Sequence, residues 1–486
     1  MKLEIQNDRV VMPRGLGPGR KIPLADIESV IIHKNADKAW LELGLAQGKN
    51  VITPKVAKEN AEEIYTKLAA IVDPPHARSD AELSLDELGR RLADLSAVKE
   101  VRASRIAGLI FDQAIRLGAS DVHIEGSAGA AKVVYRIDGV LHGVGEIAAV
   151  PAERLMTHLK VEAGVASYRR DIPQEGRIEY KGPGDEATDL RLSFIPAHGS
   201  EKAVARIFAG RRGQMGLAEL GFSPHIYDGL LRLLSRRSGM ILLTGPSASG
   251  KTTTIYSALR YLIAGPRIGA GVVTIEDPIE CRLPGATQVQ VDVRRDMTFS
   301  RLLGNALRQD AEVIAVGEIR DAETAAIAVQ AALTGQLLLS TLHAGHAPEV
   351  VVRLLDLGIE PYRVASSLAG ALSQRLLRAI CDNCREDYRP PDILLGQYAD
   401  CIPGGATFQR GAGCEKCFNT GYRNRAVVAE LLEVDDSWEI LLRGRPSSAE
   451  VTATALKSGM KPIVQDAVAK ACAGLTTLVE IKRALG

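Results

Sequence analysis

The stretch that decides the fold runs from Ile241 to Thr254 and reads ILLTGPSASGKTTT. An apolar run enters a loop of the pattern Gly-x-x-x-x-Gly-Lys-Thr, and sequence compatible with a helix follows. In a P-loop of this pattern, glycines let backbone N–H groups curl around phosphates. Lys251 then reaches the β- and γ-phosphate oxygens, and the Thr252 hydroxyl binds Mg²⁺. The stretch therefore predicts a site for a nucleoside triphosphate.

The residues expected to contact the nucleotide are the loop and the start of its helix. They are Gly245, Pro246, Ser247, Ala248, Ser249, Gly250, Lys251, Thr252 and Thr253. A plain Gly/Ser turn before a helix is the alternative, and the strand and helix signals on either side favour the P-loop over it.

Composition limits the remaining possibilities. A chain of 486 residues exceeds what one hydrophobic core usually supports, so two to four domains are expected. The net charge of +1 gives no global electrostatic reason to expect nucleic acid or a membrane surface as partner. The first residues lack the apolar core of a signal peptide, and no apolar run is long enough to cross a bilayer. These features predict a soluble, cytoplasmic protein.

Four parts are expected along the chain. Residues 1–75 alternate short apolar strands with turns and end in a helical stretch, which predicts a small β-rich domain that loosely resembles a pleckstrin-homology fold. Residues 76–100 read as a linker helix. An α+β pattern covers residues 101–213, and strands alternate with helices over 214–486, as in a parallel sheet covered by crossover helices.

Two strand-like runs after the P-loop end in acidic residues. Val272–Glu276 continues into Asp277 and is stopped by Pro278, and Val313–Val316 leads through Gly317 to Glu318. Ligands bind at the carboxyl ends of strands in open α/β sheets, so both acids are expected at the nucleotide. The alternative for Glu276 is a solvated strand end.

The acid of the second run is displaced by one position from the Asp that holds Mg²⁺ in most P-loop enzymes. Glu318 is expected to orient the attacking water or to hold Mg²⁺ through water. Arg320 and Asp321 are expected to organise the next helix. A third strand, over 336–343, ends in His343, a candidate γ-phosphate sensor whose alternative is a polar strand-end residue.

Two Cys-x-x-Cys pairs lie in the last quarter of the chain and are separated by an insert. The four thiolates of Cys381, Cys384, Cys414 and Cys417 suit tetrahedral Zn²⁺, in a structural site with no position left for water. A redox pair or four unrelated buried thiols are the alternatives. The remaining cysteines are read as packing or surface residues; they are Cys281, Cys401 and Cys472.

Taken together, residues 100–486 resemble the secretion and type IV pilus assembly ATPases, in the branch typified by type II secretion motors. Residues 274–280 resemble that family's aspartate box, 316–321 its unusual Walker B motif and 340–343 its histidine box. The resemblance implies a RecA-like P-loop ATPase domain with a parallel sheet, preceded by an α+β, PAS-like second N-terminal domain. It also implies a zinc module over 377–425 and a helical C-terminal region over 430–486.

Segments upstream of the P-loop resemble the family's second N-terminal domain, around 119–125, 135–141, 172–178 and 189–193. Arginines of that domain reach the nucleotide in the family, and position matching assigns this role to Arg191 and Arg206. A guanidinium fork suits charge that develops on a transferring phosphoryl group. Surface ion pairing is the alternative for both arginines.

Three features depart from the family pattern. Residues 344–346 (Ala-Gly-His) follow His343 where relatives usually carry Thr-Asn and a small or acidic residue, and Ser247-Ala248 stands where Thr-Gly is usual. The first domain is unlike the family's usual docking domain, which leaves open the protein that it binds.

The resemblance implies a motor that hydrolyses ATP with Mg²⁺, carries structural Zn²⁺ and works as a homohexameric ring. Its partners would be an inner-membrane platform protein and a recruiting protein, with no direct contact to nucleic acid, at the cytoplasmic side of the inner membrane. Family members that retract pili generally lack the four-cysteine insert, so the insert favours extension or secretion. The alternatives are a nucleotide-binding assembly or docking factor with little hydrolysis, and a DNA-translocating motor.

Overall fold

The computed structural model forms two compact units, Met1–Ile207 and Phe208–Gly486. From residue 82 onward, the described ranges are 82–98, 101–127, 129–182, 187–208, 215–265, 271–435 and 437–486. Before residue 82, the described parts are 4–6, 9–11, 21–23, 27–34, 38–45, 50–52, 56–57, 60–61, 63–64 and 68.

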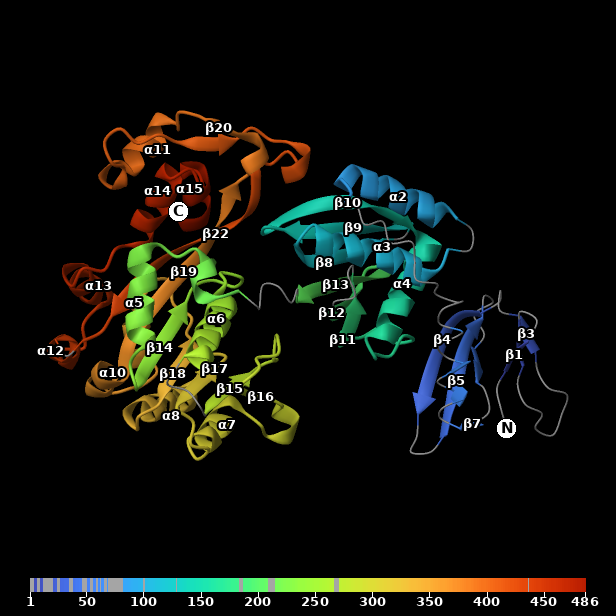
Figure 1. Ribbon diagram of the computed structural model, residues 1–486, viewed down its shortest axis with the longest axis horizontal. Helices are drawn as coiled ribbons and strands as arrows, with labels where there is room; N and C mark the ends of the chain where they lie inside the picture. The colour runs from blue at the N-terminus through green and yellow to red at the C-terminus, as the bar shows by residue number, and fades with distance from the viewer. Residues whose placement is uncertain are drawn as a thin grey trace. The chain divides into compact units, whose positions relative to one another are not determined.

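The described parts of the first 81 residues are mainly short antiparallel strands (Figure 1). One sheet has the order β1-β2-β3, and in the other β5 pairs with β4, β6 and β7. Their bounds are β1 Glu4–Gln6, β2 Arg9–Val11, β3 Lys21–Pro23, β4 Ile27–Lys34, β5 Lys38–Leu45, β6 Asn50–Ile52 and β7 Val56–Ala57. The helical stretch expected at the end of this domain, over residues 57–71, lies partly outside the described residues. Ala61, Ile64 and Leu68 within it are buried at helical spacing.

A six-stranded sheet with helices forms the rest of the first unit, in the order β10-β9-β8-β13-β12-β11. Its strands are β8 Ala119–Gly126, β9 Ala130–Ile137, β10 Val140–Ala148, β11 Gln174–Lys181, β12 Ala187–Ala197 and β13 Ser200–Phe208. Its helices are α2 Leu85–Ala97, α3 Ala103–Arg116 and α4 Ala149–Glu162. Helix α2, in the expected linker stretch, packs against β10. A Cβ on Gly89 would lie 2.3 Å from the Val144 carbonyl oxygen, so this contact requires glycine.

The second unit is built on a seven-stranded sheet in the order β16-β15-β17-β18-β14-β19-β22. All neighbouring pairs are parallel except β19–β22. The strands are β14 Gly239–Thr244, β15 Val272–Glu276, β16 Thr287–Gln290, β17 Val313–Val316, β18 Leu337–Thr341, β19 Leu368–Ile380 and β22 Tyr422–Glu433. Every residue of β14 is buried, as expected of a strand covered on both faces. The predicted fold class, an α/β protein with a parallel sheet, is confirmed.

Helices cover both faces of this sheet. Ile241 and Leu243 of β14 pack in one core cluster with α5 Pro224–Leu234 and α6 Lys251–Ala264. Met240 and Leu242 alternate with them and pack in a second cluster on the other face. The helices that contribute to this second cluster are α7 Phe299–Ala306, α8 Ala322–Leu333, α9 Glu349–Asp356, α10 Pro361–Ser367, α12 Trp438–Arg443 and α13 Ser448–Lys457. Outside the cysteine insert, this unit also contains the 3₁₀ turns η3 Leu217–Leu220 and η4 Val293–Arg295.

The long hairpin β19–β22 carries the insert between the cysteine pairs, drawn in orange in Figure 1. The insert contains η5 Asp382–Cys384, β20 Arg385–Asp387, α11 Asp392–Gln397, η6 Ala399–Cys401, β21 Gln409–Gly411 and η7 Glu415–Cys417. Helices α14 Ile463–Cys472 and α15 Leu478–Leu485 pack on the hairpin. Glu480 of α15 is fully buried and forms ion pairs with Arg378 and Arg483. Within the described part of the chain, we find no helix that combines the length and hydropathy of a membrane span.

Candidate active site and metal site

The P-loop connects the end of β14 to the start of α6. Gly245, Ala248 and Gly250 have φ of 138°, 61° and 92°. A Cβ on Gly245 would lie 2.5 Å from the Gln374 carbonyl oxygen, so only glycine fits there. Ala248 adopts a left-handed conformation that costs a residue with a Cβ about 1–2 kcal/mol. The loop is therefore held in a curled shape that its sequence does not fully favour.

Polar contacts hold this loop against β19. The Gln374 side chain donates from Nε2 to the Ser249 carbonyl at 2.8 Å and accepts from Thr254 Oγ1 at 3.0 Å. Lys251 Nζ donates to the carbonyls of Gly245 and Pro246 at 2.8 and 2.9 Å. Burial, and then the charge of Arg375, lower the pKa of Lys251. A desolvated cation beside curled backbone suits an anionic ligand such as a polyphosphate.

The three strand-end residues expected at the nucleotide lie at one edge of the sheet. Glu276 ends β15, Glu318 follows β17 and His343 follows β18, and these strands run parallel to β14 or to each other. His343 Nε2 lies 3.6 Å from Glu318 Oε2. The Glu318 side chain is 17% exposed and also pairs with Arg320, whereas His343 is 64% exposed. The structure therefore brings Glu318 and His343 together.

Glu276 is more deeply buried, at 9% exposure. Its carboxylate accepts hydrogen bonds from Thr274 Oγ1 at 2.6 Å, from Gln288 Nε2 at 3.1 Å and from the Tyr256 hydroxyl. A cavity of about 50 Å³ lies beside it and is lined also by Thr252. The arrangement does not fit a solvated strand end, because the carboxylate is buried and accepts three hydrogen bonds from protein side chains.

The loop after His343 is fixed through its backbone. The Thr244 hydroxyl donates to the Ala344 carbonyl at 2.6 Å and accepts from its N–H at 2.9 Å. Further along, Arg375 Nη2 donates to the Gly345 carbonyl at 2.9 Å, and the Ala347 N–H donates to Glu430 at 2.8 Å. These contacts use main-chain atoms, so the unusual side chains at 344–346 do not prevent them.

Asp321 has the role expected of it. Its Oδ1 accepts from the Thr324 N–H at 2.8 Å, and Asp321 is the N-cap of α8. Sequence reasoning did not find the contacts of Tyr256, Gln288, Gln374 and Glu430. The polar residues at 373–375, inside the mainly apolar run of β19, were a signal for the contacts of Gln374.

Arg191 and Arg206 lie on β12 and β13 of the first unit, away in sequence from the P-loop of the second. Arg191 Nη2 lies 2.8 Å from Glu175 Oε2, and Arg206 Nε lies 3.0 Å from Asp121 Oδ1. Asp121 is 9% exposed at its side chain, whereas Arg206 is 66% exposed. Both arginines therefore form ion pairs within their own unit, and their role at the nucleotide stays a prediction.

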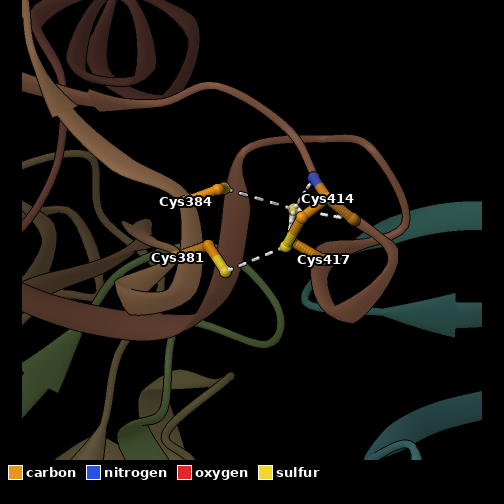
Figure 2. A group of neighbouring side chains, drawn as sticks. All are labelled: Cys381, Cys384, Cys414 and Cys417. Carbon is orange, nitrogen blue, oxygen red and sulfur yellow. Dashed lines mark hydrogen bonds between the residues drawn. The ribbon is translucent and has the colours of Figure 1, made fainter.

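Figure 2 shows the four predicted cysteine ligands converging from the two ends of the insert. Their sulfur atoms all lie within 4.8 Å of one another, and Cys381–Cys414, Cys384–Cys417 and Cys414–Cys417 are 3.9, 3.8 and 3.7 Å apart. Zn–S bonds of about 2.3 Å in a tetrahedron require sulfur atoms about 3.8 Å apart. The cluster therefore has the size of a tetrahedral zinc site.

Backbone and side-chain donors surround these sulfurs. The N–H groups of Gly413 and Gly421 point to Cys384 and Cys417, each at 3.3 Å. Burial opposes ionisation of Cys414, but hydrogen bonds led by that from Asn383 lower its pKa to about 6. Burial raises the pKa of Cys384 to about 12. Four thiolates this close repel one another, so a cation between them is needed to keep all four ionised.

The other three cysteines are free, and each is partly buried. None of them belongs to the described cluster of candidate metal ligands.

The comparisons with known proteins identify the family of this chain. Residues 98–483 match the family model described as Type II/IV secretion system protein. The chain belongs to this family. The matched range includes the P-loop, the strand-end residues Glu276, Glu318 and His343, and the cysteine cluster. The predicted family is therefore confirmed.

Named relatives include both pilus and secretion proteins. Over 442 residues the chain is 35% identical to the type IV pilus assembly ATPase PilB of Thermus thermophilus, covering 88% of this chain and 48% of that protein. It is 36% identical over 444 residues to the type II secretion system ATPase E of Vibrio cholerae, covering 91% and 86%. The chain thus spans about half the length of the first relative.

Solved structures share the fold. The pilus retraction motor PilT with bound ADP has a TM-score of 0.53 at 26% identity, covering 77% of this chain and 95% of that one. The ATPase DotB of Legionella pneumophila has a TM-score of 0.56 at 19% identity over 78% of this chain and 95% of its own. Both neighbours share the fold of this chain, which confirms the expectation of a RecA-like ATPase fold.

Proposed function

We propose that this protein is a motor that hydrolyses ATP to drive the assembly of a pilus or a secretion pseudopilus. The observation that carries the proposal is the meeting of Glu318 and His343, at 3.6 Å, on the sheet edge that also holds the P-loop and Glu276. The names of the relatives support the same class of activity, because they are ATPases of pilus assembly and type II secretion.

The residues divide the chemistry of phosphoryl transfer to water among them. The P-loop N–H groups and Lys251 bind the phosphates, and the Thr252 hydroxyl is an oxygen ligand of the kind that Mg²⁺ prefers. When bound, Mg²⁺ neutralises charge on the β- and γ-phosphates. Glu318 orients the attacking water and accepts its proton, since its carboxylate lies at the open end of the sheet. His343 contacts the γ-phosphate and reports its presence to the loop that follows.

Two features of the proposal involve more than one unit or subunit. Arg191 and Arg206 exchange their acidic partners for the transferring phosphoryl group, and stabilise its charge. The working form is a ring of identical subunits, a hexamer, in which movement between the two units does the mechanical work. The platform protein at the inner membrane receives that work, and the N-terminal domain binds a recruiting protein.

Zinc has a structural role in the proposal. The four cysteines bind Zn²⁺ and close the insert on the β19–β22 hairpin, which supports extension or secretion rather than retraction. All four ligands come from the protein, so no position remains for a reacting water. We place the protein in the cytoplasm, peripherally attached to the inner membrane.

The test is Mg²⁺-dependent ATP hydrolysis by the full-length protein and by Glu318→Gln. The variant should bind ATP with unchanged affinity and lose turnover by about 100-fold or more, in line with the usual contribution of a general base. Glu323→Gln, an exposed acid on the first turn of α8, is the control and should keep turnover. Tight ATP binding by the wild type without turnover would favour the docking factor instead.

A further inference from the structure

The carboxylate of Glu276 is surrounded by donors from three structural elements. Thr274 lies on the same strand, Gln288 on the neighbouring strand β16 and Tyr256 on α6, and each donates to the carboxylate. A buried carboxylate stays charged only when such donors replace the water it has lost. Of the three donors, only Tyr256 belongs to the helix that begins at the P-loop.

The direction of the Tyr256 hydroxyl follows from its neighbours. It lies closer to Glu276 Oε2 than to the Cys281 carbonyl, which is 3.2 Å away, so its single proton goes to the carboxylate. Its oxygen accepts from the Cys281 N–H and from Gln288 Nε2, each at 3.4 Å. Burial, and then the hydrogen bond to Glu276, raise the pKa of Tyr256 far above its usual value. The hydroxyl is therefore a permanent donor.

Tyr256 also shares a cavity with Thr252, the expected Mg²⁺ ligand. Thr252 and Tyr256 are four residues apart on α6, which places them on one face of the helix. Both line the cavity of about 50 Å³ together with Glu276, Gly317 and Thr341. A cavity of this volume has room for a water molecule, and the polar residues of its lining are Thr252, Tyr256, Thr274, Glu276 and Thr341. Thr252 and Glu276 therefore line the same cavity.

We propose that Tyr256 is a positioning residue that aims the Glu276 carboxylate, through water, at the Mg²⁺ held by Thr252. Tyr256 lies on the phosphate-binding helix and Glu276 on β15, so a shift of that helix moves the donor relative to the carboxylate that it orients. The inference rests on the proposed function, since it assigns Glu276 to Mg²⁺-ATP. It adds a residue that no motif in the chain points to.

The test compares Tyr256→Phe with Tyr261→Phe in the full-length protein. The first change removes only the buried hydroxyl, and the second removes an exposed one from the same helix. We expect Tyr256→Phe to lower kcat by about tenfold or more with KM for ATP within twofold, since small misplacements at a reacting centre cost up to about 100-fold. Tyr261→Phe should match the wild type.

A second readout does not depend on turnover. The affinity for a fluorescent ATP analogue is measured with and without Mg²⁺. The affinity with Mg²⁺ is divided by the affinity without it, and this Mg²⁺ ratio is compared among the variants. Tyr256→Phe should reduce this ratio by about tenfold, as is usual when an outer-shell partner of a metal site is lost. An unchanged ratio together with an unchanged kcat would overturn the proposal.

A double-mutant cycle with Glu276→Gln separates positioning from general stabilisation. If Tyr256 acts through Glu276, Tyr256→Phe should leave the Mg²⁺ ratio unaltered in the Glu276→Gln background. If Tyr256→Phe lowers the Mg²⁺ ratio by the same factor in the wild-type and the Glu276→Gln backgrounds, the proposal is overturned. A wild type that binds Mg²⁺-ATP without hydrolysing it would remove the proposed function, while the binding ratios would still decide the role of Tyr256.

Discussion

Replacing Glu430 by Gln tests the contact that joins the loop after His343 to the C-terminal helices. Glu430 is 2% exposed, and its two oxygens accept from different chain segments, from the Ala347 N–H at 2.8 Å and from the Ile463 N–H at 2.9 Å. His346 Nδ1 lies 3.5 Å from the same carboxylate. Gln keeps the shape but has only one oxygen, so one buried N–H would face an amide NH₂.

The cost has two parts. A hydrogen bond to a charged group contributes about 1.5–3 kcal/mol, and a buried N–H left without a partner costs about 1–3 kcal/mol. These parts overlap, so we expect the free energy of unfolding to fall by about 2–4 kcal/mol. For a unit of this size, that loss corresponds to a decrease of roughly 5–10 °C in Tm.

The matched control is Glu433→Gln, three residues along the same strand. Glu433 is 38% exposed at its side chain and pairs with Arg232 at the surface, so its loss should cost at most about 1 kcal/mol. Urea unfolding of the full-length variants, followed by circular dichroism, measures both changes. Equal effects of the two substitutions, or a Glu430→Gln effect below about 1 kcal/mol, would refute the reasoning, because a buried acceptor pair costs more than this.

Three further changes test other parts of the structure. Ala248→Gly should raise Tm by about 1–3 °C. The substitution removes the strain of the left-handed conformation, and this gain exceeds the loss that arises because glycine gives the unfolded chain more entropy. A lower Tm would contradict the observed φ. Cys384→Ser should lower both Tm and the amount of bound zinc, which elemental analysis measures. The control, Cys401→Ser, should change neither quantity. A wild-type protein that is fully stable without zinc would exclude the site. The pKa of Glu480 lies below its usual value because hydrogen bonds from Arg483 and Arg378 outweigh burial. The charged Glu480 therefore stabilises the fold above the pKa of the unfolded state, and this stabilisation is lost as pH falls below about 4.5. In Glu480→Gln, the free energy of unfolding should depend less on pH in this acid range. The same pH dependence as in the wild type would contradict this.

The strands that carry the site could be predicted closely because their burial is visible in the sequence. β17 was expected over 313–316 and is observed there, and β15 was expected over 272–276 and ends at Glu276. Parallel strands covered on both faces read as continuous apolar runs, and their carboxyl ends meet at one edge. That rule placed Glu318 and His343 at the same edge of the sheet, and the pairing of β17 with β18 brings them together.

The contacts behind these residues could not be predicted. Glu430 meets Ala347 across 83 positions of sequence, and Tyr256 meets Glu276 across 20, through packing that no local pattern encodes. The cysteine spacing predicted a metal cluster because both pairs carry the same local turn, and the sulfur distances agree with it. The domain boundaries and the catalytic roles stay predictions, since they depend on how the units and subunits work together.

The most direct measurement is ATP hydrolysis by the full-length protein and by Glu318→Gln, with oligomeric mass recorded in the same samples with and without nucleotide. The account predicts Mg²⁺-dependent turnover that rises with ring formation and disappears in the variant, while ATP binding is retained. Turnover that is unchanged in Glu318→Gln would contradict the assignment of the water-orienting carboxylate, and tight ATP binding without turnover in wild-type rings would contradict the motor.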